Sequence, residues 1–234
     1  MSELFSIQLQ NRQQQGRDGV WLDLPTTTEQ VQAALRQIGI SSDNPQGLFI
    51  SGYFAEEEKR FAIPYNMVLA SNVDELNFLA ARLETLSAGE RAELNAALQA
   101  PQSELSSIGK ITDFPENVEY YVYLPDVRGP AQLGDYYLNR SGMVNMPEEW
   151  KGGIDTAQFG RYVAQQEQGV FTEYGYLVKS GDAWQKVHEG QPVPEEYRVL
   201  SFPAPEVLRD SANIPPPVQP ETEPQKVIPI ILNG

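Results

Sequence analysis

An excess of acidic side chains limits what this chain can fold into. The sequence holds 32 Asp and Glu against 17 Lys and Arg, a formal net charge of −15, and such an excess repels itself in a compact state. Yet 41% of the residues are hydrophobic, enough to build a core rather than stay disordered. Charge alone therefore fits either an ordinary soluble acidic protein or one that presents anionic charge to a cationic partner.

Composition excludes several kinds of site. The sequence has no cysteine and one histidine, His188, so disulfides, thiolate ligands and zinc sites with several histidines are excluded. The deficit of Lys and Arg argues against direct binding to nucleic acid or to anionic membrane. Because no apolar run reaches about 20 residues and the first residues lack a signal-peptide pattern, we expect a cytoplasmic protein.

The N-terminal part predicts a small sheet with one helix. Alternating apolar residues and turn signals predict strands over residues 4–9, 20–24 and 48–53. Thr26 and Glu29 have the spacing of a capping box, and the apolar residues that follow recur at helical spacing up to Gly39. We expect these elements to form an α+β subdomain over residues 1–62.

From Ser71 onward the apolar spacing becomes helical. One predicted helix places four apolar residues on one face: Leu76, Leu79, Ala80 and Leu83. Ser87 with Glu90 starts a second helix, with Leu94, Ala97 and Leu98 pointing inward. This pattern predicts a helical middle subdomain over residues 63–104.

A third α+β subdomain is expected over residues 105–178. Strand composition appears at 118–124 and again at 170–178, Pro130 opens a short helix, and Asp155 caps another helix. Further short strands are predicted within residues 179–210, at 184–187 and 197–202, and a Pro-rich tail over 211–234 is expected to be disordered. The predicted class is thus α+β, with three small subdomains in an elongated arrangement.

No motif singles out an active site. The sequence contains neither a glycine-rich phosphate loop with Lys-Ser/Thr nor a metalloprotease helix motif. Helix capping explains Asp155, and His188 lies in a Gly- and Pro-rich stretch where we expect an exposed loop residue. We expect no enzyme activity, no cofactor and no metal; an acidic hydrolase, which would need converging carboxylates, is the third-ranked interpretation.

Tyrosines crowd one part of the chain, and tyrosine is favoured at protein interfaces. On a strand, Tyr121 and Tyr123 share one face while Tyr120 lies on the other. Core packing accounts for part of this set. The candidates for a dimer or partner contact are Tyr121, Tyr123, Tyr136 and Tyr137.

Three sets of short motifs follow one another over residues 4–178. The first is Phe5-Ser6-Ile7-Gln8-Leu9 with Gly19-Val20-Trp21-Leu22-Asp23-Leu24-Pro25, and the second is Val73-Asp74-Glu75-Leu76-Asn77. The third runs in the order Asp135-Tyr136-Tyr137-Leu138, Ile154-Asp155, Phe159-Gly160-Arg161 and Gly169-Val170-Phe171. This order resembles the ArdA family of antirestriction proteins, since the three sets are similar to the family's opening, its helical middle and its last domain.

This resemblance implies an elongated protein, dimeric through its last domain, that is encoded on mobile genetic elements such as conjugative transposons. It further implies that surface carboxylates imitate bent B-form DNA and block the DNA-binding groove of type I restriction-modification enzymes. The chain departs from the family in two places. Asn139 and Arg140 follow the paired tyrosines where acids are usual, and the residues after 178 have no family counterpart.

Charge density is sufficient for such mimicry. Duplex DNA carries one negative charge per about 1.7 Å of its axis, so a net charge of 15 could imitate about 25 Å per subunit, and a dimer about 15 base pairs. The candidate DNA-mimicking acids are Asp74, Glu75, Glu84, Glu90, Glu93, Asp113, Glu116, Glu119, Asp126, Asp135, Glu148, Glu149, Asp155, Glu167 and Glu173. The alternative is a non-mimic adaptor of a mobile element that acts through aromatic surfaces and its Pro-rich tail.

Overall fold

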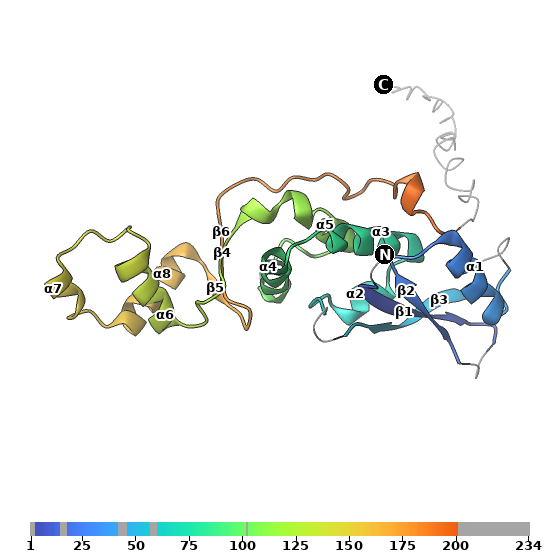
Figure 1. The fold of residues 1–234 in the computed structure, drawn as a ribbon, viewed down its shortest axis with the longest axis horizontal. Helices are drawn as coiled ribbons and strands as arrows, with labels where there is room; N and C mark the ends of the chain where they lie inside the picture. Colours follow the sequence, from blue (N-terminus) through green and yellow to red (C-terminus); the bar gives the residue numbers. More distant parts are fainter. Residues whose placement is uncertain (1–2, 15–17, 42–45, 57–59, 102, 201–234) are drawn as a thin grey trace, which may run out of the picture. The chain divides into compact units, whose positions relative to one another are not determined.

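The computed structural model describes residues 3–14, 18–41, 46–56, 60–101 and 103–200. Within them the fold is α+β, with helices and two small antiparallel sheets, which confirms the predicted class (Figure 1). No helix in these ranges is both long enough and apolar enough to cross a bilayer. The predicted tail over 211–234 lies outside the described residues.

The N-terminal sheet has the strand order β2-β1-β3, with antiparallel pairing throughout. Its strands and the adjoining helix are β1 (Phe5–Asn11), β2 (Val20–Leu24), β3 (Leu48–Phe54) and α1 (Thr28–Gln37). Alternation along β1 buries Phe5, Ile7 and Leu9 against the core, while the residues between them face outward. A register shift between Gln8 and Leu9 marks a bulge in the pairing with β3.

The predicted cap of α1 is wrong by one residue. Thr27 is the N-cap, and Gln30 completes the capping box, so the pair Thr26–Glu29 plays no such part. Thr26 is instead buried, and its backbone N–H donates a hydrogen bond to Asn77, at 2.7 Å. Three consecutive threonines offer equivalent caps, and the contact with Asn77 selects the middle one.

The helical layer packs on the buried face of this sheet in one continuous core. Its helices are α2 (Tyr65–Leu69), α3 (Val73–Glu84), α4 (Ala88–Gln99) and α5 (Ile108–Thr112). The predicted inward residues of α3 and the capping box of Ser87 and Glu90 at α4 are confirmed. Leu94 and Ala97 are buried as predicted, whereas Leu98 is half-buried.

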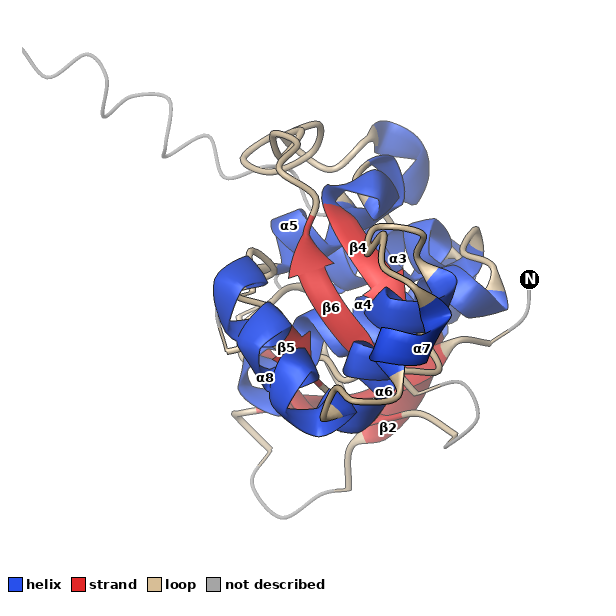
Figure 2. Ribbon diagram, turned by 90° about the vertical axis from the view of Figure 1, so that its left-hand side faces the viewer, coloured by secondary structure: helices blue, strands red, loops and turns tan. Residues whose placement is uncertain are grey.

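Residues 121–179, here named the C-terminal module, contain the second sheet, with the order β4-β6-β5 (Figure 2). The elements are β4 (Tyr121–Leu124), α6 (Pro130–Asp135), a π-helical turn (Tyr136–Arg140), α7 (Glu148–Lys151), α8 (Thr156–Glu167), β5 (Val170–Phe171) and β6 (Tyr176–Lys179). Asp155 caps α8, as predicted. Helices α6 and α8 touch so closely that a Cβ on Gly160 would lie 1.8 Å from the Pro130 carbonyl oxygen.

Two strand predictions in this part of the chain need correction. Residues 118–120 form a 3-10 turn, so β4 begins only at Tyr121. The predicted strand over 170–178 is a hairpin of β5 and β6, turned at Gly175, whose φ of 155° favours glycine. The Thr172 hydroxyl also donates to the Gly175 carbonyl, at 2.8 Å.

Residues 180–200, here named the strap, run from β6 along α5 to α3 (Figure 1). The short strands predicted at 184–187 and 197–202 are absent from the described part of this segment. It holds instead one 3-10 turn, Glu195–Tyr197, whose Tyr197 ring packs at a tilt against Phe78 of α3 with centroids 4.7 Å apart. The two prolines of the strap, Pro192 and Pro194, disfavour a strand ladder.

Candidate acidic interaction surface

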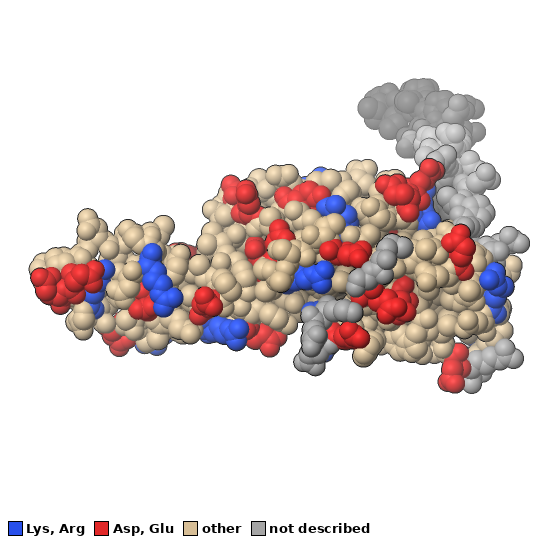
Figure 3. Space-filling model, in the orientation of Figure 1, with Lys and Arg blue, Asp and Glu red and all other residues tan. Residues whose placement is uncertain are grey.

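Acidic side chains are dispersed over the face of the molecule in Figure 3, with Lys and Arg among them. They form no single stripe on that face, although they gather at the end that carries α7. Eight of the predicted acids are exposed: Glu75, Glu116, Glu119, Asp126, Glu148, Glu149, Asp155 and Glu173. The other seven are partly or fully buried, so the structure separates acids that face solvent from acids that pack within the chain.

Several exposed acids are held by neighbouring residues. Glu116 forms an ion pair with Arg82, and Glu148 pairs with Lys151 at 2.6 Å. Gln99 donates a hydrogen bond to Glu173, and Asp155 caps α8. Glu75, Glu119, Asp126 and Glu149 form no ion pair with any other described residue.

Asn139 and Arg140, which depart from the family pattern, both bind one acid of the C-terminal module. The Asn139 side-chain amide donates to Asp135 at 2.8 Å, and Arg140 forms an ion pair with it at 2.9 Å. The hydrogen bond from Asn139, with the charge of Arg140, lowers the pKa of Asp135. Asp135 therefore stays ionised, but Arg140 cancels much of its field.

Asp113 does not belong to any surface, and its assignment to the acidic surface is wrong. The residue is 0% exposed. Its carboxylate accepts three backbone N–H bonds from the strap, from Val187 (3.2 Å), His188 (2.6 Å) and Glu189 (3.2 Å). A buried carboxylate needs such donors to offset the loss of hydration, so Asp113 anchors the strap.

Three further side chains anchor the strap, and sequence reasoning did not find this role for any of them. Asp74 accepts the backbone N–H groups of Val199 and Leu200, both at 2.8 Å. Asn117 exchanges two hydrogen bonds with the backbone of Gln185. Asn77 donates to the Tyr197 carbonyl while accepting from Thr26, so it joins the strap to the end of β2.

Glu167 is occupied by two tyrosines of the C-terminal module. The Tyr137 hydroxyl donates to one of its carboxylate oxygens and the Tyr176 hydroxyl to the other, the latter at 3.0 Å. Burial and the adjacent carboxylate raise the pKa of both tyrosines. Gly169 lies against this cluster, where a Cβ would come 1.9 Å from the Tyr176 oxygen.

The four tyrosines predicted as contacts are largely used within the chain. Tyr121 is 7% exposed and lies in the main core, so its prediction as a contact is wrong. The Tyr123 hydroxyl donates to the Tyr174 carbonyl at 2.7 Å. Tyr136 and Tyr137 are half-buried and meet edge to face.

The remaining candidate acids lie on α3 and α4. Glu84 is half-buried, and Glu90 completes the capping box at Ser87, whose hydrogen bonds lower the pKa of Glu90. Burial, with Glu90 as a second cause, raises the pKa of Glu93 to about 7. Glu93 is thus only partly ionised at neutral pH, which makes it a poor imitation of a phosphate.

His188 was predicted as an exposed loop residue, but it is half-buried, with its ring edge-on to Phe78 at 4.9 Å between centroids. It lines a cavity of about 340 Å³ with Glu75 and Glu189. Glu189 forms an ion pair with Lys186 at 3.2 Å, which leaves Glu75 as the unpaired acid of that cavity. The described residues contain no group of three or more acidic or histidine side chains placed to hold a metal ion.

Comparison with sequence models of known protein families gives a match. The sequence model of a family described as "Antirestriction protein (ArdA)" matches residues 15–178. The match covers β2 to β6 without the strap. No curated protein matches the sequence.

Proposed function

Since the chain belongs to the ArdA family of antirestriction proteins, we propose that it imitates B-form DNA and blocks the DNA-binding groove of a type I restriction-modification enzyme. The observation that carries this proposal is the family match, together with the formal charge of −15. A DNA-binding groove is lined with cations that neutralise phosphates, and an anionic protein surface competes for the same cations.

The acids best placed for this role are the exposed ones. Between residues 113 and 173 the sequence holds ten acids and four bases. Of the ten, Asp113 and Glu167 serve the fold, while Glu119, Asp126 and Glu149 are exposed without a paired cation among the described residues. These three, with Glu148 next to Glu149 on α7, are the residues that we expect to contact the enzyme.

Dimerisation through the last domain is the second part of the proposal. The most exposed large apolar or aromatic side chains of the C-terminal module are Met143 at 76%, Trp150 at 68% and Tyr162 at 60%. Exposed side chains of this kind are enriched at protein interfaces. They suit a subunit contact better than Tyr121, which the core already uses.

The test is competition on DNA. The protein is titrated into a type I restriction enzyme bound to a labelled duplex, at low and at high salt. We expect displacement of the DNA at low salt and a steep loss of displacement at high salt, because the interaction is electrostatic. A chain that ends at residue 202 shows whether the segment after it contributes.

Two results would overturn the proposal. One is the absence of displacement at low salt across enzymes from several type I families. The other is displacement that does not change with salt, which would leave antirestriction activity possible but contradict DNA mimicry. The adaptor alternative gains support only from the first result.

A further inference from the structure

The outer face of the N-terminal sheet differs in chemistry from the rest of this anionic chain. Strands β1, β2 and β3 together contain one charged residue, Asp23. The outward side chains are otherwise amides, hydroxyls and aromatic rings, and they include Ser6, Gln8, Gln10, Trp21, Phe49 and Phe54. This set, with Gly52, Asp23 and Arg12, is named the outer face.

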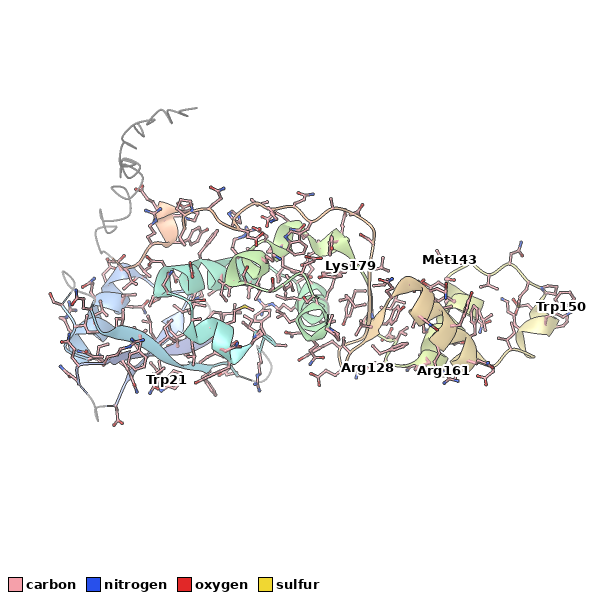
Figure 4. All side chains as sticks on the ribbon, turned by 180° about the vertical axis from the view of Figure 1, so that it is seen from behind. Trp21, Arg128, Met143, Trp150, Arg161 and Lys179 are labelled. Carbon is pink, nitrogen blue, oxygen red and sulfur yellow. The ribbon has the colours of Figure 1, made fainter. Side chains whose placement is uncertain are left out.

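Two aromatic residues are the exposed large side chains of the outer face. Trp21 is 50% exposed and Phe54 is 57% exposed, and their rings meet edge to face at 6.5 Å. Gly52 makes room for Trp21, because a Cβ there would lie 3.1 Å from the indole ring. Figure 4 places Trp21 on the side of the sheet away from α3, so the core does not use this ring.

The two charges of the outer face lie at opposite ends of it. Asp23 pairs with Ser6 near the start of β1, and Ser6 donates to its carboxylate at 2.6 Å. Arg12 follows the end of β1, with its guanidinium over the Phe49 ring, 5.2 Å from the centroid. Six residues separate these positions along β1, a span of about 20 Å. The outer face thus carries Asp23 and Phe54 in one row at its negative end, Trp21 in the next outward row, and Arg12 at its positive end.

We propose that the outer face binds the same face of a second copy of this chain, about a two-fold axis that runs across the strands. Such an axis reverses the strand direction, so Arg12 of each copy lies over Asp23 of the other. The axis crosses β1 near Leu9, beside the Gln8–Trp21 register position, which brings the two indole rings together at the centre.

Net charge supports a second copy as the occupant. Two chains of charge −15 repel each other, and they approach at least cost through this face, whose strands carry one acid, Asp23, with Glu3 and Glu56 flanking the Phe54 end. A cationic partner, in contrast, would be drawn to the acidic faces. This contact does not depend on the antirestriction proposal, and it uses a different region from the dimer contact proposed for the C-terminal module.

The first experiment measures self-association of the full chain by sedimentation equilibrium over a range of concentrations. We expect the double variant Trp21→Ser/Phe54→Ser to weaken one association step at least about tenfold, because buried aromatic side chains dominate interfaces. Val187→Ser, which removes an exposed apolar side chain from the strap, leaves that step unchanged. If the double variant associates like the wild type, the proposal is wrong and something else covers the face.

The second experiment tests the geometry of the pair. Asp23→Arg alone and Arg12→Asp alone each place like charges opposite one another, so each variant associates more weakly than the wild type. An equimolar mixture of the two variants restores Arg–Asp pairs at both ends, so it recovers the association step. A mixture that associates no better than the separate variants overturns the proposed axis, and circular dichroism melting curves verify that both variants are folded.

Discussion

Acidic residues have different roles in two regions of this molecule. Where the strap crosses α3 and α5, Asp113 and Asp74 point inward and bind backbone N–H groups. In the C-terminal module and the turn before it, Glu119, Asp126 and Glu149 point outward. The sequence shows the same residue types in both regions. The difference teaches that net charge overstates the charge available to a partner, since part of it holds the fold together.

The largest expected effect comes from removing the inward acid. Asp113→Ala leaves three backbone N–H groups of the strap without their acceptor, and we expect a loss of about 3 kcal/mol in the free energy of unfolding. Urea denaturation measures it. The matched control Glu119→Gln changes an exposed carboxylate and should shift stability by less than about 0.5 kcal/mol. Equal losses of stability in both variants would contradict the claim that Asp113 stabilises the fold and Glu119 does not.

The outward acids should show the reverse pattern. The combined variant Glu119→Gln/Asp126→Asn/Glu148→Gln/Glu149→Gln is expected to weaken displacement of DNA from the enzyme about tenfold or more, since each phosphate-like charge contributes to binding. Its unfolding midpoint in urea should remain close to that of the wild type. Full displacement activity in this variant would assign the function to other acids.

Glu93 is half-buried, between the inward and the outward acids, and its protonation makes the stability of the protein depend on pH. Its native pKa of about 7 lies above the usual 4.5, so the native state binds the proton more tightly than the unfolded chain does. The resulting stability is fully present below about pH 4.5 and is lost as pH rises through about 7. We expect the free energy of unfolding to fall by about 1–2 kcal/mol over this pH range, a value reduced for the partial exposure of the side chain.

The measurement is the urea midpoint of the wild type and of Glu93→Gln at pH 5.5 and pH 8. The variant should lose this part of the pH dependence and be the more stable protein at pH 8. Glu75→Gln, an exposed acid on α3, serves as the control that retains the dependence. Identical profiles for the wild type and Glu93→Gln would show that another group causes the change.

The smallest expected effect concerns Glu167. Tyr137→Phe removes one of its two hydroxyl donors and leaves Tyr176 in place, so the loss of stability should be about 0.5–1 kcal/mol. Thermal unfolding followed by circular dichroism can measure it. A loss several times larger would mean that the cluster acts as one network, in which the two donors cannot be separated.

Periodic patterns in the sequence were enough to predict most helices. The spacing of Leu76, Leu79 and Leu83, and the pair Ser87 and Glu90, depend on neighbours within two turns of a helix, so local reasoning suffices. The course of the strap depends on bonds such as that between Asp74 and Val199, which are 125 residues apart. No local pattern reports such a contact.

The candidate surface was predicted less well than the fold, for a physical reason. An acid on an amphipathic helix can be assigned to the polar face, but Asp113 follows a short helix at a turn, where the chain beyond it decides whether it is covered. One signal was available in the sequence. Asp113 lies between Ile111 and Phe114, both fully buried, and an acid in so apolar a setting indicates a structural role.

The strap begins just beyond the last residue of the family match, while all four of its anchors lie inside the matched region. The segment that the family model matches therefore ends before the compact folded unit does, because that unit includes the strap. A chain that ends at residue 178 would expose to water four side chains that now bind the backbone of the strap. They are Asp74, Asn77, Asp113 and Asn117. Without the strap these four side chains lose the backbone groups that they bind in it, so this role in the fold exists only in a chain in which a strap follows.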